Sequence, residues 1–130
     1  MAKFGSKSLS LLATLDGRLV DVVTLAIVIY DFSVLSTHRT MHEQNDLYET
    51  GFSKKKFPDS KHNVYPSKAV DIAPYPVDWE DELRFYYLAG VIEACAHGIG
   101  VRLRWGGDWD SDDDLHDQTF MDLGHYELID

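Results

Sequence analysis

The chain is poor in the residues that mark several large classes of protein. Cys95 is the single cysteine among 130 residues, so no disulfide can form within the chain and a disulfide-stapled scaffold is excluded. There are only 12 Lys and Arg residues against 22 Asp and Glu residues, which gives a formal net charge of −10. So little positive charge disfavours nucleic acid and anionic membranes, and we expect neither as a partner.

Long apolar runs are also missing. The best candidate, residues 22–30, is too short to cross a bilayer and is flanked by Asp21 and Asp31. It also starts too late for a good signal peptide and lacks a small-residue cleavage site. We therefore expect synthesis in the cytoplasm without a signal peptide, so any action outside the cell requires a separate release step.

The chain does contain enough apolar material for one folded domain, which we expect to span residues 1–130. Its 45% apolar and 12% aromatic residues are ordinary for a globular protein, and its length suits a single hydrophobic core. No repeat or linker interrupts it. A monomer is the default expectation.

Hydrophobic periodicity predicts the elements of this domain. Helices are expected over residues 17–30, 40–48 and 79–97, and strands over 32–36, 69–73, 101–105 and 124–129. Asp78 is the expected N-cap of the third helix, which Gly98 would end. The order of elements predicts a small α+β domain in which helices pack on an antiparallel sheet.

Two histidines and an aspartate form the strongest candidate site. His62, Asp71 and His125 would make a three-ligand zinc set with an open fourth position, as in catalytic rather than structural zinc sites. Asp122 lies three residues before His125 and is placed to act as general base on the attacking water. Spacing alone leaves a second interpretation open, three unrelated polar residues, because the sequence does not show that their strands are adjacent.

His38 and His42 form a rival pair. Their spacing would put both rings on one face of a helix, as in the His-Glu-x-x-His zinc peptidases. That motif needs a glutamate directly after the first histidine, where this chain has Arg39. We therefore do not expect this pair to bind metal.

An acidic segment offers a second candidate metal site. Oxygen ligands recur at alternate positions, as at the start of a calcium-binding loop, and the candidates are Asp108, Asp110, Asp112 and Asp117. The segment lacks the glycine and the terminal glutamate of an EF-hand. It is either a calcium site or a solvated acidic loop, and the sequence leaves both open.

Several motifs together resemble the M15 family of zinc peptidases, and most closely its phage endolysin branch. The motifs are Ser60-Lys-His62, Ala69-Val-Asp71-Ile-Ala-Pro74 and Asp122-x-x-His125-Tyr-Glu, with further similarity in residues 37–51 and 105–109. The resemblance covers about residues 9 to 129. It implies the D-alanyl-D-alanine peptidase/hedgehog-like α+β fold.

The resemblance also implies roles for individual residues. The zinc ligands would be His62, Asp71 and His125, and Asp122 would be the catalytic base. Arg39 would hold or polarise the scissile carbonyl, a role that its fixed charge suits. Ser60 would hydrogen-bond near the metal or the substrate. One departure concerns the interval between His62 and Asp71, which has eight residues with Pro66-Ser67 in the turn, longer than the common family form.

The implied function is cleavage of the peptidoglycan stem peptide during phage-induced lysis, after release through a holin. The flanking motifs favour an L-alanyl-D-glutamate endopeptidase. The alternatives are a D-alanyl-D-alanine carboxypeptidase of the same fold and a non-catalytic zinc-binding wall or virion module. Lys54-Lys55-Lys56 is either a solvated loop or a contact to the anionic cell wall.

Overall fold

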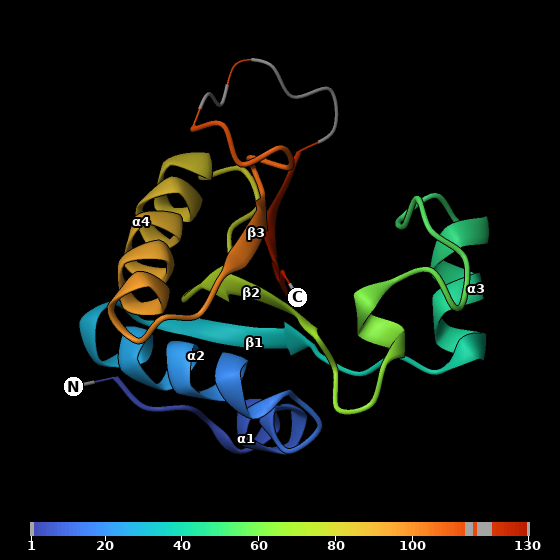
Figure 1. The fold of residues 1–130 in the computed structure, drawn as a ribbon, viewed down its shortest axis with the longest axis horizontal. Helices are drawn as coiled ribbons and strands as arrows, with labels where there is room; N and C mark the ends of the chain where they lie inside the picture. Colours follow the sequence, from blue (N-terminus) through green and yellow to red (C-terminus); the bar gives the residue numbers. More distant parts are fainter. Residues whose placement is uncertain (1, 114–115, 117–120, 130) are drawn as a thin grey trace.

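The computed structural model describes residues 2–113, 116 and 121–129 (Figure 1). The elements in chain order are α1 (Ser6–Leu12), α2 (Gly17–Ile29), β1 (Phe32–Ser36), α3 (Met41–Glu49), the 3-10 helix η1 (Lys61–Asn63), β2 (Ala69–Pro74), α4 (Glu82–Gly98), β3 (Leu103–Gly106) and β4 (Asp122–Leu128).

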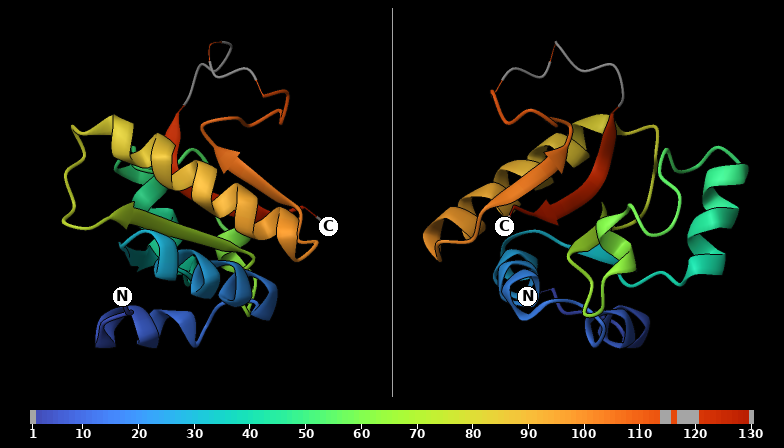
Figure 2. Two further views of the ribbon diagram at one scale, coloured as in Figure 1. Left: turned by 90° about the vertical axis from the view of Figure 1, so that its left-hand side faces the viewer. Right: turned by 45° about the vertical axis from the view of Figure 1, so that its right-hand side comes forward.

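The four strands form one antiparallel sheet with the order β1-β2-β4-β3. The last strand in the chain therefore lies inside the sheet, between β2 and β3. α4 packs against α2 and against strands β2, β3 and β4. Figures 1 and 2 place α3 and η1 on the side of the sheet away from α4. The predicted α+β class with helices on an antiparallel sheet is confirmed.

The hydrophobic core lies between the sheet, α2 and α4. Strand β4 illustrates how the alternation of side chains divides its two faces. Tyr126 and Leu128 are 0% and 1% exposed and belong to the core cluster. His125 and Glu127 alternate with them and face the side that carries α3 and η1. The fold thus presents polar residues of its inner strands to one region outside the core.

Helix α3 carries a local signal at each end. Thr40 and Glu43 form a capping box, in which each side chain accepts a hydrogen bond from the other residue's backbone N–H. Gly51 follows the helix at φ +84°, a conformation that glycine adopts without strain. The predicted helix over 40–48 agrees with these limits.

The predicted start of α4 is wrong. The helix begins at Glu82 with Asp81 as its N-cap, rather than after Asp78. Asp78 instead accepts a hydrogen bond from the N–H of Glu80 at 3.1 Å, in a turn that precedes the helix. An aspartate stabilises a turn by the same bond with which it caps a helix, so sequence does not separate the two.

In the described part of the chain, no helix has the length and apolarity to cross a membrane.

Candidate active site

The pairing of β2 with β4 brings together two of the predicted ligands. Asp71 lies directly opposite His125 in the antiparallel register. Oδ1 of Asp71 is 3.0 Å from Nδ1 of His125. Ala69 and Ala73, both small and buried, are the neighbours of Asp71 on the same face of β2. The strands that sequence could not place are therefore adjacent.

His62 reaches the same point from η1. Ser60 is the N-cap of this short helix, and its Oγ accepts a hydrogen bond from the N–H of His62 at 3.1 Å. Nδ1 of His62 is 2.6 Å from the carbonyl oxygen of Thr37. Because a carbonyl only accepts, Nδ1 carries the proton and Nε2 presents its lone pair.

Nε2 of His62 is the observation that tests the site for a metal. The side chain is 1% exposed, and Nε2 has no hydrogen-bond partner among the described residues. It lies 3.3 Å from Oδ1 of Asp71. A buried acceptor without a donor is costly unless a cation or water completes it.

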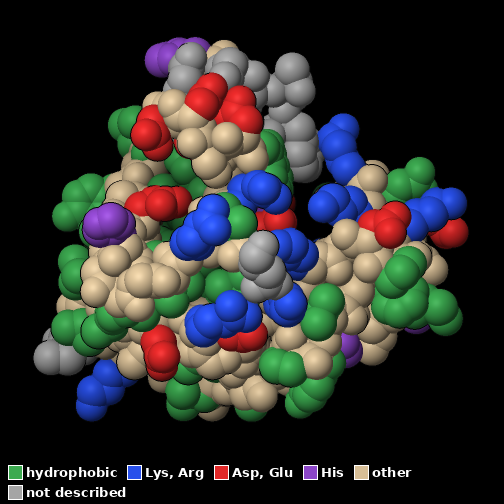
Figure 3. All heavy atoms as spheres, viewed as in Figure 1, with side chains coloured by type: hydrophobic (Ala, Val, Ile, Leu, Met, Phe, Trp, Pro, Cys, Tyr) green, Lys and Arg blue, Asp and Glu red, His purple; other side chains and the backbone are tan. Residues whose placement is uncertain are grey.

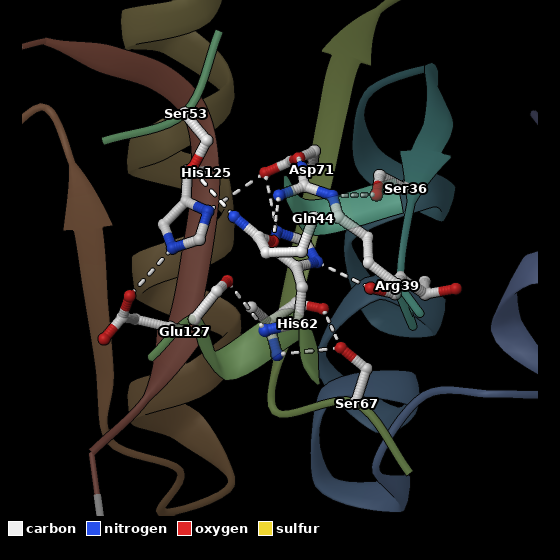
Figure 4. Close-up of polar contacts among 12 residues, drawn as sticks. Ser36, Arg39, Gln44, Ser53, His62, Ser67, Asp71, His125 and Glu127 are labelled. Carbon is white, nitrogen blue, oxygen red and sulfur yellow. Dashed lines mark hydrogen bonds and ion pairs between the residues drawn. The ribbon is translucent and has the colours of Figure 1, made fainter. Parts of the chain in front are cut away.

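His62, Asp71 and His125 each offer one ligand atom, and these atoms lie within 4.8 Å of one another (Figure 4). The residues could therefore hold a metal ion. Two imidazole nitrogens and one carboxylate oxygen are a donor set that suits zinc.

Glu127 contacts the ring nitrogen of His125 that does not contact Asp71. Its Oε1 is 2.8 Å from Nε2 of His125, and the residue is 3% exposed. Arg104 Nη1 and Lys61 Nζ lie 3.4 and 3.9 Å from the other carboxylate oxygen. Sequence analysis gave Glu127 no role. The available signal was its position two residues after His125, on the same face of a strand.

Arg39 lies beside the predicted ligands. Its Nη2 is 2.6 Å from Oδ2 of Asp71, and its Nε donates to Oγ of Ser36 at 3.1 Å. The guanidinium therefore neutralises the carboxylate oxygen that faces away from the two histidines. Its predicted contact with a scissile carbonyl stays a prediction.

Gln44 links this arginine to the loop after α3. The side chain is fully buried, and its Oε1 accepts from Arg39 Nη1 at 3.3 Å. Its Nε2 donates to Ser53 Oγ at 2.9 Å and to the carbonyl of Lys55 at 2.6 Å. A buried amide with all these partners fixes the loop relative to the site. The sequence marked Gln44 only as part of the resemblance.

The site opens into a cleft of about 270 Å³. Its lining comprises Arg39, Phe52, Ser53, Lys54, Lys55, Ser60, Lys61, His62, Trp109, Asp122, His125 and Glu127. Asp122 is the first residue of β4, which begins two residues before the strand predicted over 124–129. Burial raises the pKa of Asp122, and the charge of Asp71 raises it further.

The ionisable groups of the site shift one another's pKa values in opposite directions. Burial alone would lower the pKa of His125, but its hydrogen bonds to Asp71 and Glu127 raise it to about 9. Burial would raise the pKa of Asp71, but the two histidines hold it well below its ordinary value.

The acidic segment forms a second group. The carboxylates of Asp108, Asp110 and Asp112 have oxygens within 4.8 Å of one another. Asp108 accepts from the N–H groups of Asp112 and Asp113 at 3.3 and 3.0 Å. The fourth predicted ligand, Asp117, lies outside the described residues. The segment touches the first site because the rings of Trp109 and His125 are 5.4 Å apart.

The rival histidine pair is not brought together. His42 lies on α3, where its Nε2 is 3.2 Å from Oδ2 of Asp46. His38 precedes the helix, and its ring contacts that of Tyr65 at 5.2 Å. Neither belongs to the potential metal groups found among the described residues.

Comparison with known proteins extends the likeness from the motifs to the whole fold. A family model for phage L-alanyl-D-glutamate peptidase matches residues 1–129. The L-alanyl-D-glutamate peptidase of Escherichia phage T5 is 33% identical over 135 residues, which cover 98% of each chain. The crystal structure of the Serratia marcescens L-Ala D-Glu endopeptidase ChiX superposes with a TM-score of 0.76 at 26% identity, covering 97% of this chain and 89% of that one.

Proposed function

Because the chain belongs to the phage L-alanyl-D-glutamate peptidase family, an M15 endolysin branch, we propose that it is a zinc-dependent peptidoglycan peptidase. The bond cleaved is the one between L-alanine and D-glutamate in the stem peptide. The observation that carries this proposal is the convergence of His62, Asp71 and His125, because both histidines line the cleft together with Asp122. The unit that acts is one domain, residues 1–130.

Zinc is the metal that we propose for this group. Zinc bound there would acidify a water molecule and polarise the scissile carbonyl at neutral pH. His62 would bind through Nε2, because its Nδ1 donates to the carbonyl of Thr37. His125 would bind through Nδ1, because its Nε2 is engaged by Glu127. Both rings are thus held in one orientation by contacts on their far sides.

Asp122 is the proposed general base. Its carboxylate takes a proton from the attacking water and passes it to the leaving amine. Burial raises the pKa of Asp122, and so does the charge of Asp71, which makes its carboxylate a stronger base toward the attacking water. Arg39 lines the same cleft and stabilises negative charge on the carbonyl oxygen as the water adds.

Two other functions are separable by experiment. A D-alanyl-D-alanine carboxypeptidase would release terminal D-alanine, whereas the proposed enzyme leaves L-alanine as a new C-terminus. A non-catalytic wall or virion module would bind peptidoglycan without cutting it, and the proposed role of Asp122 argues against this module. The family match favours the L-alanyl-D-glutamate peptidase over both alternatives.

Mass spectrometry of purified peptidoglycan after digestion tests the proposal. We expect new ends at L-alanine and D-glutamate, loss of cleavage after chelation, and recovery with stoichiometric zinc. Release of D-alanine alone would establish the carboxypeptidase. Intact stem peptides with a zinc-loaded, folded protein would establish the binding module.

Two parts of the proposal lie outside the cleft. We propose that Asp108, Asp110 and Asp112, with Asp117, bind calcium, supported by the convergence of the first three carboxylates. Titration of calcium should raise the melting temperature and the activity, and no change in either would refute this site.

Release from the cytoplasm through a holin is the second part. Expression with and without a holin should then differ in lysis of the host.

A further inference from the structure

Helix α3, whose following loop lines the cleft, has few ties to the rest of the fold. In Figure 3, basic side chains gather on both sides of the hollow between the sheet and the α3 segment. The helix makes only sparse contacts with the other described helices and strands. Gln44 is the one buried residue of α3, a helix that is described throughout. Helices usually attach through an apolar stripe, so a helix whose buried side chain is an amide depends on its hydrogen bonds.

The partners of Gln44 determine which way its amide points. The carbonyl oxygen of Lys55 only accepts hydrogen bonds, so the atom that lies 2.6 Å from it is Nε2. The guanidinium of Arg39 only donates, so the atom that lies 3.3 Å from its Nη1 is Oε1. Both ends of the side chain thus require the same orientation. The amide of Asn63 agrees, because its Nδ2 donates to the same Oε1 at 3.3 Å.

Gln44 is one of three residues that hold the guanidinium of Arg39 (Figure 4). Its Nε donates to Ser36 at 3.1 Å, its Nη2 to Asp71 at 2.6 Å and its Nη1 to Gln44. Ser36 and Asp71 are register partners on β1 and β2, so both contacts come from the sheet. Among the described residues, Gln44 supplies the one hydrogen bond to the guanidinium from outside the sheet. These bonds use three of five N–H donors, so donors remain for a substrate oxygen.

An uncharged residue suits this position. Asp71 pairs with Arg39 and is also a proposed metal ligand. A carboxylate at position 44 would compete with Asp71 for the guanidinium, and it would have no N–H for the carbonyl of Lys55. An amide gives an acceptor to the arginine and a donor to the loop, so it orients Arg39 without drawing the charge away from Asp71.

We propose that Gln44 is a positioning residue for catalysis, which holds Arg39 where its guanidinium meets the carbonyl oxygen of the scissile bond. The proposal rests on the proposed function. It extends that function by joining α3 and the loop over residues 53–55 to the chemical step. The joining residue is 0% exposed and acts through Arg39 rather than on the substrate.

Two variants of Gln44 test this role with the zinc-loaded enzyme and a stem peptide. Gln44→Met keeps the length of the side chain without its amide, and kcat should fall about 10- to 100-fold, the cost of misplacing a catalytic group. Gln44→Glu keeps the shape of the amide and should lower kcat as well. Both should bind zinc as the wild type does, because the hydrogen bonds of Gln44 reach none of the three proposed ligands.

A double-mutant cycle with Arg39→Ala determines whether Gln44 acts through the arginine. Arg39→Ala alone should lower kcat. In that background Gln44→Met should change kcat by less than about twofold, because no guanidinium is left to position. Losses that multiply in the double variant would mean that Gln44 acts independently of Arg39, and they would overturn the proposal.

Asn45→Leu is the matched control, because Asn45 also ties α3 to the following loop. Its Oδ1 accepts from the N–H of Phe57 at 3.1 Å, and in the described part of the chain it has no hydrogen bond to Arg39. This variant should leave kcat unchanged. A loss equal to that of Gln44→Met would show that the attachment of the loop matters rather than the orientation of the arginine, and would overturn the proposal.

Hydrogen exchange at Nε of Arg39, followed by NMR, tests the orientation without the reaction. The proton that Nε donates to Ser36 is protected while the guanidinium is held. It should exchange about tenfold faster in Gln44→Met than in the wild type, because opening then breaks one hydrogen bond fewer. Asn45→Leu should exchange as the wild type does. Equal protection in all three proteins would overturn the proposal.

Failure of the proposed function has a different result. A zinc-loaded wild type that leaves stem peptides intact would remove the proposed function, and the role of Gln44 with it. Cleavage by the wild type and equal cleavage by Gln44→Met would remove the role of Gln44 alone. Loss of zinc from both Gln44 variants would place the effect at the metal, which also contradicts a role through Arg39.

Discussion

Nε2 of His125 and Oε1 of Glu127 lie 2.8 Å apart on one face of β4. The carboxylate is 3% exposed and is balanced by Arg104 at 3.4 Å. A buried carboxylate in this position fixes the orientation of a histidine ring and increases its basicity toward a metal on the opposite nitrogen. Glu127 is therefore a positioning residue for the proposed zinc site.

Glu127→Gln should weaken zinc binding by about 10- to 100-fold, the range found when such supporting contacts are removed. Competition with a chromophoric chelator measures this affinity without reference to activity. Glu49→Gln, at the exposed end of α3, is the control and should bind zinc as the wild type does. Wild-type affinity in Glu127→Gln would show that the contact does not support the metal.

Asp122→Asn should retain zinc and lose hydrolysis by a factor on the order of 10² to 10⁴, the contribution of a positioned general base. The amide keeps the shape of the side chain but takes up no proton from water. Zinc content and the rate of stem-peptide cleavage are measured on the same sample. Full activity in a zinc-loaded variant would reject Asp122 as the base.

Gly124→Ala should destabilise the protein by about 1–3 kcal/mol, because overpacking forces the backbone apart. A Cβ at this position would lie 2.5 Å from the carbonyl oxygen of Ile72 on β2. The strain would fall between the strands that bear Asp71 and His125, so zinc affinity should fall as well.

The same substitution at Gly90 in α4 is a control with the opposite expected effect on stability. A Cβ at Gly90 meets nothing within 4 Å. Gly90→Ala should therefore stabilise the helix by about 0.5–1 kcal/mol. Thermal unfolding compares the two variants, and a lower melting temperature for Gly90→Ala than for Gly124→Ala would contradict the packing argument.

Glu93→Gln should raise the melting temperature at neutral pH. The pKa of Glu93 is raised, first by desolvation and then by the charges of Asp108 and Asp113, so ionisation of this carboxyl opposes folding. The gain should disappear as the pH falls below the ordinary value of 4.5, where the carboxyl is protonated in both folded and unfolded chains. Glu80→Gln, exposed in the turn before α4, is the control and should leave the melting temperature at neutral pH unchanged.

Local sequence signals predicted the elements well where one signal dominates. Hydrophobic periodicity predicted a strand over residues 69–73 and a helix over 40–48, close to the observed β2 (Ala69–Pro74) and α3 (Met41–Glu49). The start of α4 was missed because Asp78 and Asp81 are both good caps, and the turn between them decides which one is used.

The sequence predicted which residues form the site better than it predicted how they come together in space. Histidines and aspartates at suitable spacing suggested His62, Asp71 and His125, but their convergence depends on the pairing of β2 with β4, which no local pattern encodes. Gln44 and Glu127 owe their importance to what they contact. Such contacts become visible only when distant segments are placed together.

The insertion of β4 between β2 and β3 has a consequence for the timing of activity. During synthesis, β1, β2, β3 and all the helices leave the ribosome before β4 does. Until then the sheet lacks an inner strand, and the nascent chain has neither His125 nor Asp122 to complete the site. On the proposed roles of His125 and Asp122, a chain without β4 would be inert toward its substrate, and competence would come only with this strand.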